Sequence, residues 1–383
     1  MTAALPEEEA PPTTSLQLND DVVTEILLRL PSASVLRSHA VCRAWRAIAT
    51  RPGFLAAHAR RRPLEIIIKD GGGPDDALAL HTVPLASLDE ASRRCLQSLH
   101  PGYAGGRWSL AASCDGLLLL VARGPACIEE HLLVCNPVTR QRAVVPPPST
   151  SRMARACGFY LHGPSGEHRI VFLANDEESA GLGSSASHHV RSLEAGETRR
   201  LGPAAAALHM YTWIPKAFGH RGNLHWIEHP ETEDAGDVVL VFDTVRETFR
   251  RMARPPVGSG YYAASDLVLM EADGMLATAA IRGGSVDIWV MEDHDGGESW
   301  TRRHRLDIDL PPPLPDVGWA SVMMVGQNAI LLRRLEGHAA ALYDLTEKRV
   351  MKQLQLSRTD YLTAHVFRDS LERHAFFDLQ EQS

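Results

Sequence analysis

Two periodicities predict an α+β multidomain protein, in which a small N-terminal all-α unit precedes an all-β propeller of about six blades. Residues 18 to about 62 carry apolar side chains at the spacing of α-helices. From about residue 64, short β-rich runs alternate with Gly, Pro, Asp and Asn. This second pattern recurs roughly every fifty residues, the length of one four-stranded propeller blade. A pair of stacked β-sandwiches is the alternative architecture for the same region.

The composition limits the cellular compartments and the classes of partner that we expect for this chain. At 383 residues, the chain can form one large and one small domain. Its net charge of -8 gives no general attraction to nucleic acid, and its longest apolar run, Leu117–Ala122, is too short to span a bilayer. The 6 cysteines form no CxxC pair, so we expect no zinc framework, no disulfide scaffold, and a reducing compartment, the cytoplasm and/or nucleus. Residues 1–15 are expected to be a disordered acidic tail rather than a signal peptide.

The helical unit begins with a helix that either Asn19 or Asp20 can cap. Pro31 ends this helix, because the residue before a proline disfavours helical geometry, and Ser32 or Ser34 can cap the next one. The first helix is predicted to present one wide apolar face, made of Val22, Val23, Ile26, Leu27 and Leu30.

The stretch VCRAWRAI, residues 41–48, is predicted to be a short helix with a tryptophan on its apolar stripe. Val41, Ala44, Trp45 and Ile48 recur at i, i+3, i+4 and i+7. After the break at Pro52-Gly53, another helical turn is expected to begin with Phe54, Leu55 and His58.

A unit of about forty residues rarely sustains its own core without a metal, a disulfide or a partner. Some apolar surface of these helices is therefore expected to be covered by a second polypeptide. Trp45 is the natural anchor, because aromatic residues in desolvated pockets carry a disproportionate share of binding energy. The alternative is that Trp45 packs only against the chain's own helices or its first blade.

The β-rich region contains five readable units, each an apolar strand, a polar turn and a second strand. A partner strand lies near each unit, and a sixth unit can come from residues 64–70 with 78–85, or from joining the two ends of the domain. Residues 86–99 are predicted to form a local helix. The five units begin at Leu132, His189, Val239, Val286 and Ala340, and their partner strands begin at Gly116, Arg169, Asn223, Met275 and Ala329.

Residues 18–48, LNDDVVTEILLRLPSASVLRSHAVCRAWRAI, resemble an F-box. Asn19 departs from the family pattern, which usually has proline there, but asparagine also favours a helix start. The positions that match the pattern are Leu18, Asp20, Asp21, Ile26, Leu27, Leu30, Pro31, Leu36, Val41, Cys42, Arg43 and Trp45.

The remaining region is similar to the F-box-associated, Kelch-like propellers of large plant F-box families. The pieces that carry the similarity are SCDGLLLL, CNPVTRQRAVVPPP, GNLHWIEH, VDIWVMED with ESW, and ALYDLTEKR. The resemblance implies an F-box domain at residues 16–62 and a substrate-binding β-propeller at 63–383.

By resemblance, the F-box docks on an S-phase kinase-associated adaptor, and through it on the cullin and RING subunits of an SCF-type ubiquitin ligase. The chain would be a non-catalytic receptor that holds an unknown protein substrate, with no cofactor, no metal, no nucleic acid and no membrane partner. The residues expected to bind the adaptor are Leu18, Val22, Ile26, Leu30, Pro31, Leu36, Val41, Cys42 and Trp45.

Four aromatic residues in or near Gly- and Pro-containing connections are candidates for substrate contact: Trp213, Tyr261, Tyr262 and Trp319. Packing between blades is the alternative role for each. A metal site at His220, His225 and His229 is disfavoured, because strand alternation places residues at odd separations on opposite faces. Two other functions are kept open, an adaptor-binding protein acting outside ubiquitination and a propeller-fold enzyme with an incidental helical extension.

Overall fold

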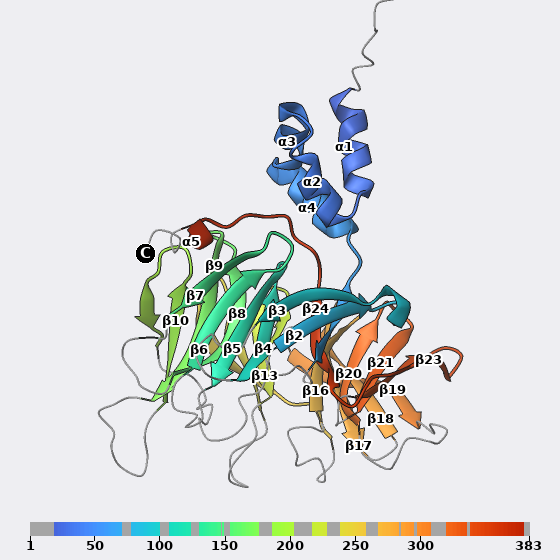
Figure 1. The fold of residues 1–383 in the computed structure, drawn as a ribbon. Helices are drawn as coiled ribbons and strands as arrows, with labels where there is room; N and C mark the ends of the chain where they lie inside the picture. The colour runs from blue at the N-terminus through green and yellow to red at the C-terminus, as the bar shows by residue number, and fades with distance from the viewer. Residues whose placement is uncertain are drawn as a thin grey trace, which may run out of the picture. The chain divides into compact units, whose positions relative to one another are not determined.

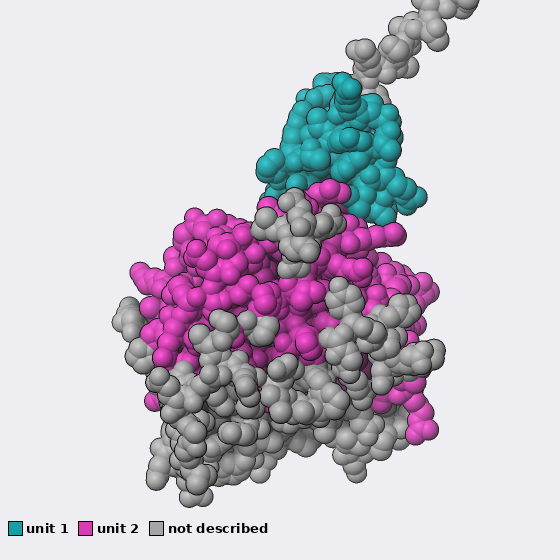
Figure 2. Space-filling model, turned by 60° about the vertical axis from the view of Figure 1, so that its left-hand side comes forward, with its two compact units in different colours: residues 1–62 teal, residues 63–383 magenta. Residues whose placement is uncertain are grey.

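The computed structural model describes residues 19–70, 78–99, 107–123, 130–146, 148, 154–175, 186–202, 217–227, 238–257, 267–282, 285–294, 297–307, 319–334 and 338–378. The chain divides into two compact units, residues 1–62 and 63–383 (Figure 2). Among the described residues, every helix is too short or too polar to cross a bilayer.

The described part of the first unit, residues 19–62, contains four helices, α1 (Asp20–Arg29), α2 (Ser32–Ser38), α3 (Arg43–Ala49) and α4 (Pro52–Arg61) (Figure 1). The Asn19 side chain accepts a hydrogen bond from the backbone N–H of Asp21 at 3.3 Å, so the predicted cap of α1 is confirmed. Leu30 is extended ahead of Pro31, as expected for the residue before a proline.

Two helix boundaries differ from the sequence expectation. Pro31, not a serine, holds the N-cap position of α2, and Ser32 is already the first helical residue. Helix α3 begins only at Arg43, because the Cys42 sulfur accepts the backbone N–H of Trp45 at 3.4 Å and thereby acts as the cap. Val41 therefore lies in a turn, and the prediction that it continues the stripe of α3 was wrong.

The core of the helical unit is small, and α4 closes it. His58 is fully buried, and its Nε2 donates to the backbone oxygen of Leu30 at 3.1 Å, while Arg62 Nη2 donates to the oxygen of Leu28 at 3.2 Å. Both contacts satisfy carbonyl groups at the C-terminal end of α1, which no helical N–H can reach. The apolar residues buried in this unit are Val23, Leu27, Leu28, Val35, Ile48, Ala49 and Phe54.

The second unit consists of six four-stranded antiparallel sheets among the described residues (Figure 1). Sheet 1 is β24 (Asp360–Phe367), β1 (Glu65–Asp70), β2 (Leu78–Pro84) and β3 (Arg94–Leu99). Sheet 2 is β4 (Arg107–Cys114), β5 (Leu117–Arg123), β6 (Glu130–Asn136) and β7 (Gln141–Val145). Sheet 3 is β8 (Ala154–His162), β9 (Glu167–Asn175), β10 (Ala186–Ser192) and β11 (Thr198–Arg200).

The other three sheets follow the chain in the same simple up-and-down order. Sheet 4 is β12 (Phe218–His220), β13 (Asn223–Ile227), β14 (Val238–Asp243) and β15 (Thr248–Ala253). Sheet 5 is β16 (Leu267–Ala272), β17 (Met275–Arg282), β18 (Ser285–His294) and β19 (Gly297–Asp307). Sheet 6 is β20 (Trp319–Val325), β21 (Ala329–Arg334), β22 (Ala339–Asp344) and β23 (Arg349–Gln355).

Apolar clusters fill every junction between neighbouring sheets, from sheets 1 and 2 around to sheets 6 and 1. A sandwich would bury each sheet against one opposing sheet, whereas here each sheet packs against two neighbours. The six-bladed propeller is therefore confirmed, and the β-sandwich alternative was wrong.

Sheet 1 closes the ring by combining both ends of the domain. Strand β24, from the C-terminal end, pairs antiparallel with β1, and Thr363 Oγ1 donates to the backbone oxygen of Ile67 at 2.9 Å. Both sources considered for the sixth unit thus contribute to the same blade. The helix expected at residues 86–99 was wrong, because β3 pairs with β2 there and only a 3-10 turn, Glu90–Ser92, precedes it.

The chain continues after β24 into a segment that we call the C-terminal strap, residues 368–378, which ends in the short helix α5 (Ala375–Asp378) (Figure 1). Phe376 and Phe377 of α5 are buried in the apolar cluster between sheets 2 and 3. The strap thus connects blade 1 with the junction of blades 2 and 3.

Candidate functional site

The helical unit leaves part of its apolar surface uncovered. On α1, Val23 and Leu27 are buried, whereas Val22 and Ile26 are 46% and 39% exposed. Val41, in the turn before α3, is 62% exposed. Three of the eight large hydrophobic side chains exposed among the described residues therefore belong to the smaller unit.

The other residues expected to bind the adaptor also remain outside the core. Pro31 and Cys42 are exposed, and Leu30, Leu36 and Trp45 are half-buried. Leu18 lies outside the described residues. We call the eight described positions the docking residues: Val22, Ile26, Leu30, Pro31, Leu36, Val41, Cys42 and Trp45.

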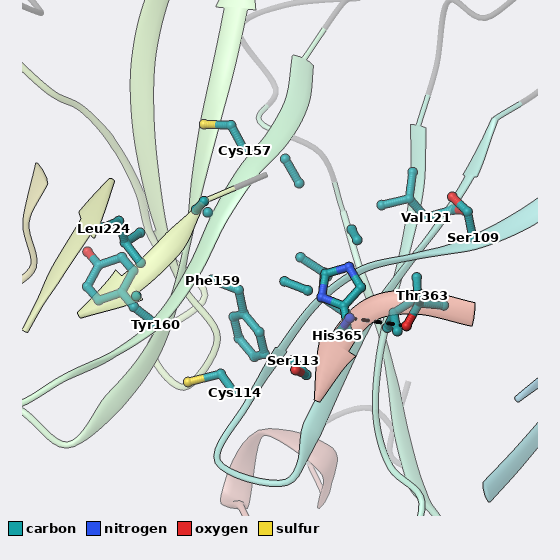
Figure 3. Close-up of a pocket in the computed structure, with 18 of the residues that line it drawn as sticks. Ser109, Ser113, Cys114, Val121, Cys157, Phe159, Tyr160, Leu224, Thr363 and His365 are labelled. Atoms are coloured by element: carbon teal, nitrogen blue, oxygen red, sulfur yellow. Dashed lines mark hydrogen bonds between the residues drawn. The ribbon is translucent and has the colours of Figure 1, made fainter. Parts of the chain in front are cut away.

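The propeller contains a channel lined by the innermost strand of each sheet. One cavity of about 1120 Å³ lies mainly between β4, β8, β12 and β24, and another of about 920 Å³ lies mainly between β12, β16, β20 and β24. Ser113 and His365 line both cavities, which are therefore two parts of one channel. Figure 3 shows His365 of β24 inside the first cavity, where its backbone N–H donates to Thr363 Oγ1 at 3.2 Å.

Basic residues gather where β1 ends and β24 begins. Lys69, Arg333 and Arg358 line the first cavity there, next to the exposed ring of Tyr361. Arg333 Nη1 donates to the Tyr361 hydroxyl at 2.8 Å, and its guanidinium carbon lies 5.3 Å from the centre of the ring. This basic, aromatic group, which we call the basic mouth, contrasts with the net charge of -8 of the whole chain.

The four aromatic residues predicted to contact substrate are not brought together in the described structure. Trp213, Tyr261 and Tyr262 lie outside the described residues. Trp319 begins β20, an inner strand of the channel, but its side chain is outside what the structure describes. Arg333 and Tyr361 were not predicted as site residues, because only the pairing of β24 with β1 brings their strands to the same end of the channel.

Two histidines of GHRGNLHWIEH, His220 and His225, lie among the described residues, and both make contacts within the propeller. His220 Nδ1 lies 3.0 Å from a Glu271 carboxylate oxygen, and His225 Nδ1 donates to the backbone oxygen of Phe218 at 3.2 Å. Burial lowers the pKa of His225 to about 4, so its ring is neutral at physiological pH. His229 lies outside the described residues, and the two described rings are 6.3 Å apart.

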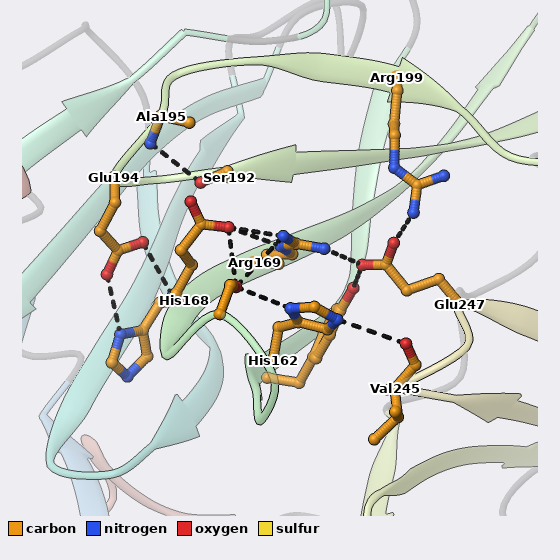
Figure 4. A network of polar contacts seen from close by, with 12 residues as sticks. His162, His168, Arg169, Ser192, Glu194, Ala195, Arg199, Val245 and Glu247 are labelled. Atoms are coloured by element: carbon orange, nitrogen blue, oxygen red, sulfur yellow. Dashed lines mark hydrogen bonds and ion pairs between the residues drawn. The ribbon is translucent and has the colours of Figure 1, made fainter.

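A polar network connects blades 3 and 4 (Figure 4). Glu247, whose side chain is 4% exposed, accepts a hydrogen bond from Arg169 Nη1 at 2.7 Å and forms an ion pair with Arg199. The hydroxyl of Tyr160 donates to the same carboxylate, and burial raises the pKa of this phenol. A buried carboxylate satisfied by two guanidinium groups and a phenol is typical of a structural tie rather than of a reactive group.

Comparisons with known proteins cover both units. Residues 15–56 match the F-box domain model, and residues 106–372 match the model described as the F-box associated beta propeller domain. F-box protein At3g07870 of Arabidopsis thaliana is 23% identical over 78% of this chain and 74% of its own length. F-box protein CPR1 of the same plant is 26% identical over 74% of this chain and 71% of its own length.

Solved structures are more distant. One chain of a nidogen/laminin complex is 12% identical, with 81% of this chain and 100% of that chain covered, at a TM-score of 0.49. TolB from Acinetobacter baumannii is 11% identical, with 85% and 71% covered, at a TM-score of 0.41. Neither similarity indicates a function.

Neither matched model describes an enzyme family. An F-box domain implies an S-phase kinase-associated adaptor as partner, and an F-box followed by a propeller fits the substrate receptor of an SCF-type ligase in general. The propeller model matches more than half of the chain, and the relatives are Arabidopsis F-box proteins. The chain therefore belongs to the plant F-box proteins that carry a C-terminal F-box-associated β-propeller domain.

Proposed function

We propose that this chain is the substrate-recognition subunit of an SCF-type ubiquitin ligase. In this proposal, the docking residues bind the adaptor, and the propeller holds a target protein. The chain itself supplies no catalytic group, because its task is to position the target beside a ubiquitin carrier.

The observation that carries the proposal is the exposure of Val22, Ile26 and Val41 on a four-helix unit whose core is small. Burying each of these side chains completely is worth roughly 1.5–3 kcal/mol, and each has already lost about half of its exposure, which leaves about 1 kcal/mol apiece. Half-buried Trp45 adds aromatic surface that an adaptor pocket can finish covering. These contributions favour association, although the cost of losing translational and rotational freedom opposes it.

The channel of the propeller supports the proposal that this domain holds a target protein. The basic mouth, with Lys69, Arg333, Arg358 and Tyr361, is suited to an acidic segment of a target protein. The aromatic ring and the guanidinium groups offer both apolar area and directional hydrogen bonds, the combination common at binding hot spots.

Tethering explains how such a subunit promotes ligation without chemistry of its own. Holding a target next to a ubiquitin-loaded carrier raises the effective concentration to about millimolar for short flexible connections. A rigid scaffold adds orientation to this proximity. The cytoplasm and/or nucleus is the compartment that this role requires.

Co-purification from plant cells tests the proposal. The full chain is expected to retain both the adaptor and a cullin, and Val41→Glu is expected to lose both. Val245→Glu is the matched control, because Val245 is 53% exposed in the propeller unit and lies outside the proposed interface. Recovery of the adaptor without a cullin would indicate a role outside ubiquitination, and recovery of neither would remove the receptor proposal.

A further inference from the structure

Three side chains from different parts of the second unit form a group that the receptor function does not use. They are His168 of β9, Glu194 in the turn between β10 and β11, and His374 of the C-terminal strap. One donor atom from each lies within 4.8 Å of the other two. None of the three lines the channel cavities. Figure 4 shows His168 beside Glu194.

His168 and Glu194 are held in fixed positions relative to one another. The backbone N–H of His168 donates to Glu194 Oε2 at 2.9 Å, and His168 Nδ1 lies 3.3 Å from Oε1. The backbone N–H of Leu193 donates to the oxygen of His168 at 2.9 Å, so the turn that carries Glu194 is fastened to β9. This histidine and its carboxylate are therefore preorganised.

The C-terminal strap delivers His374 to the same place. Asn136 Nδ2 donates to the backbone oxygens of Ser370 at 3.2 Å and Glu372 at 3.1 Å, which fixes the strap just before His374. The ring centres of His168 and His374 are 4.7 Å apart at 83°, and His374 stacks on Phe376 at 5.5 Å. Two imidazoles and one carboxylate thus converge from separate elements.

Both imidazoles have an unsatisfied nitrogen. The Nε2 atoms of His168 and of His374 are buried and have no hydrogen-bond partner among the described residues. Since Nδ1 of His168 faces Glu194, an ion shared with that carboxylate would bind Nδ1 of His168, and the unsatisfied nitrogen that it would bind is Nε2 of His374. His168 is only 3% exposed. Buried polar atoms almost always have a partner, and leaving one without a partner is costly. Imidazole nitrogens with a carboxylate are the donors that late first-row divalent metals prefer.

A second arrangement, His168 with Cys114 and Asp115, has donor atoms within the same 4.8 Å. In that arrangement the Cys114 thiol already donates to Asp115 Oδ2 at 3.4 Å. Cys114 and Asp115 therefore satisfy one another. His168 belongs to both arrangements, so the difference between them is the unsatisfied Nε2 of His374. The observations favour the set that includes His374.

We propose that His168, Glu194 and His374 bind one divalent late first-row metal ion, for which Zn²⁺ is the probe, and that the ion clamps the C-terminal strap onto blade 3. Ligand atoms around a tetrahedral zinc lie about 3.4 Å apart. His168 Nδ1 and Glu194 Oε1 are already 3.3 Å apart, so only the side chain of His374 moves, on the order of 1 Å, to close the site. His374 lies outside the strands, where such a movement of its side chain is easy. The site fastens the chain end that closes the propeller.

Calorimetric titration of Zn²⁺ into the metal-free full-length chain tests the site. We expect about one tight equivalent per chain in the wild type, and a loss of affinity of at least tenfold in His168→Ala and His374→Ala. His220→Ala is the matched control, because His220 also pairs with a carboxylate, that of Glu271, but belongs to neither donor group. Cys114→Ser is likewise expected to keep the site.

Thermal unfolding gives an independent measurement that also monitors folding. An ion that binds only the folded state raises its Tm, so Zn²⁺ is expected to raise the Tm of the wild type, of His220→Ala and of Cys114→Ser, but not of His374→Ala. His374→Ala alters only a short strap, so its metal-free Tm should remain measurable even where His168→Ala does not fold. Equal zinc binding by all variants, the absence of a tight equivalent in the wild type, or loss in Cys114→Ser alone would overturn the assignment.

Discussion

Arg93 holds Asp360 with two hydrogen bonds, from Nη1 to Oδ2 at 2.8 Å and from Nη2 to Oδ1 at 2.9 Å, across 267 positions of sequence. Arg93 directly precedes β3, and Asp360 begins β24, so the pair connects the N-terminal and C-terminal contributions to blade 1. Only 8% of the Asp360 side chain is exposed. Bidentate pairs of this kind are among the stronger polar contacts in proteins.

Asp360→Asn is therefore expected to lower the free energy of unfolding of the propeller by about 2 kcal/mol, because Arg93 loses a charged acceptor. Glu90→Gln is the matched control, since Glu90 contacts the same guanidinium at 3.0 Å but its side chain is 48% exposed. Its effect should stay within about 0.5 kcal/mol. Chemical denaturation measures both, and equal losses would contradict the role given to Asp360.

The same pair predicts a dependence of stability on pH. The hydrogen bonds from Arg93 hold the pKa of Asp360 below its ordinary value of 3.8. The folded state thus binds a proton at Asp360 more weakly than the unfolded state does. The ionised carboxylate therefore stabilises the folded state fully above pH 3.8, and this stabilisation is lost as the pH falls through the lower pKa of the folded state. The difference in unfolding free energy between wild type and Asp360→Asn should be constant from neutral pH to about pH 5 and shrink below the ordinary pKa. An undiminished difference in the most acidic samples would contradict this origin.

Replacing Gly116, in the turn between β4 and β5, with alanine is expected to destabilise the propeller. Its φ is +82°, and a Cβ there would collide with the Cβ of Ser370 in the C-terminal strap. Gly166→Ala is the matched control, because Gly166 has a φ of +69° with open space around it. We expect Gly166→Ala to cost about 1 kcal/mol and Gly116→Ala at least twice that, measured by denaturant unfolding. Equal costs would show that the strap does not pack as described.

Cysteine labelling can locate the adaptor interface. Cys42 and Cys95 are both exposed, Cys42 among the docking residues and Cys95 on β3 of the propeller. A bound adaptor is expected to slow alkylation of Cys42 at least tenfold and to leave Cys95 unchanged, as followed by peptide mass spectrometry. Cys135 should stay unlabelled throughout, since burial raises the pKa of its thiol to about 12. Equal alkylation of Cys42 with and without adaptor would place the interface elsewhere.

The strands were predictable because their apolar runs have the right length and end at strong turn signals. Residues 117–121, for example, are all buried in β5. Residues 86–99 were misassigned to a helix because their strand character depends on β2, a partner that local sequence does not reveal. The pairing of β24 with β1 in blade 1 likewise depends on contacts between residues far apart in the sequence.

The docking residues were less predictable one by one. Val22, Val23, Ile26 and Leu27 all appeared to belong to one apolar face, and only the packing of α1 separates the buried pair from the exposed pair. The group around His168 left no signal in the sequence, since its members come from a strand, a turn and the strap. Spacing rules detect metal sites only where the ligands lie close together in the chain.

In the proposed function, exposed apolar side chains of the helical unit bind the adaptor. The most direct measurement is the Kd of the purified adaptor for the wild type, Ile26→Glu and Val245→Glu, with Tm confirming that each chain is folded. We predict a Kd at least tenfold weaker for Ile26→Glu, because a charge is buried where an apolar group was covered, and an unchanged Kd for Val245→Glu. An unchanged Kd for Ile26→Glu would show that the exposed face of α1 does not bind the adaptor.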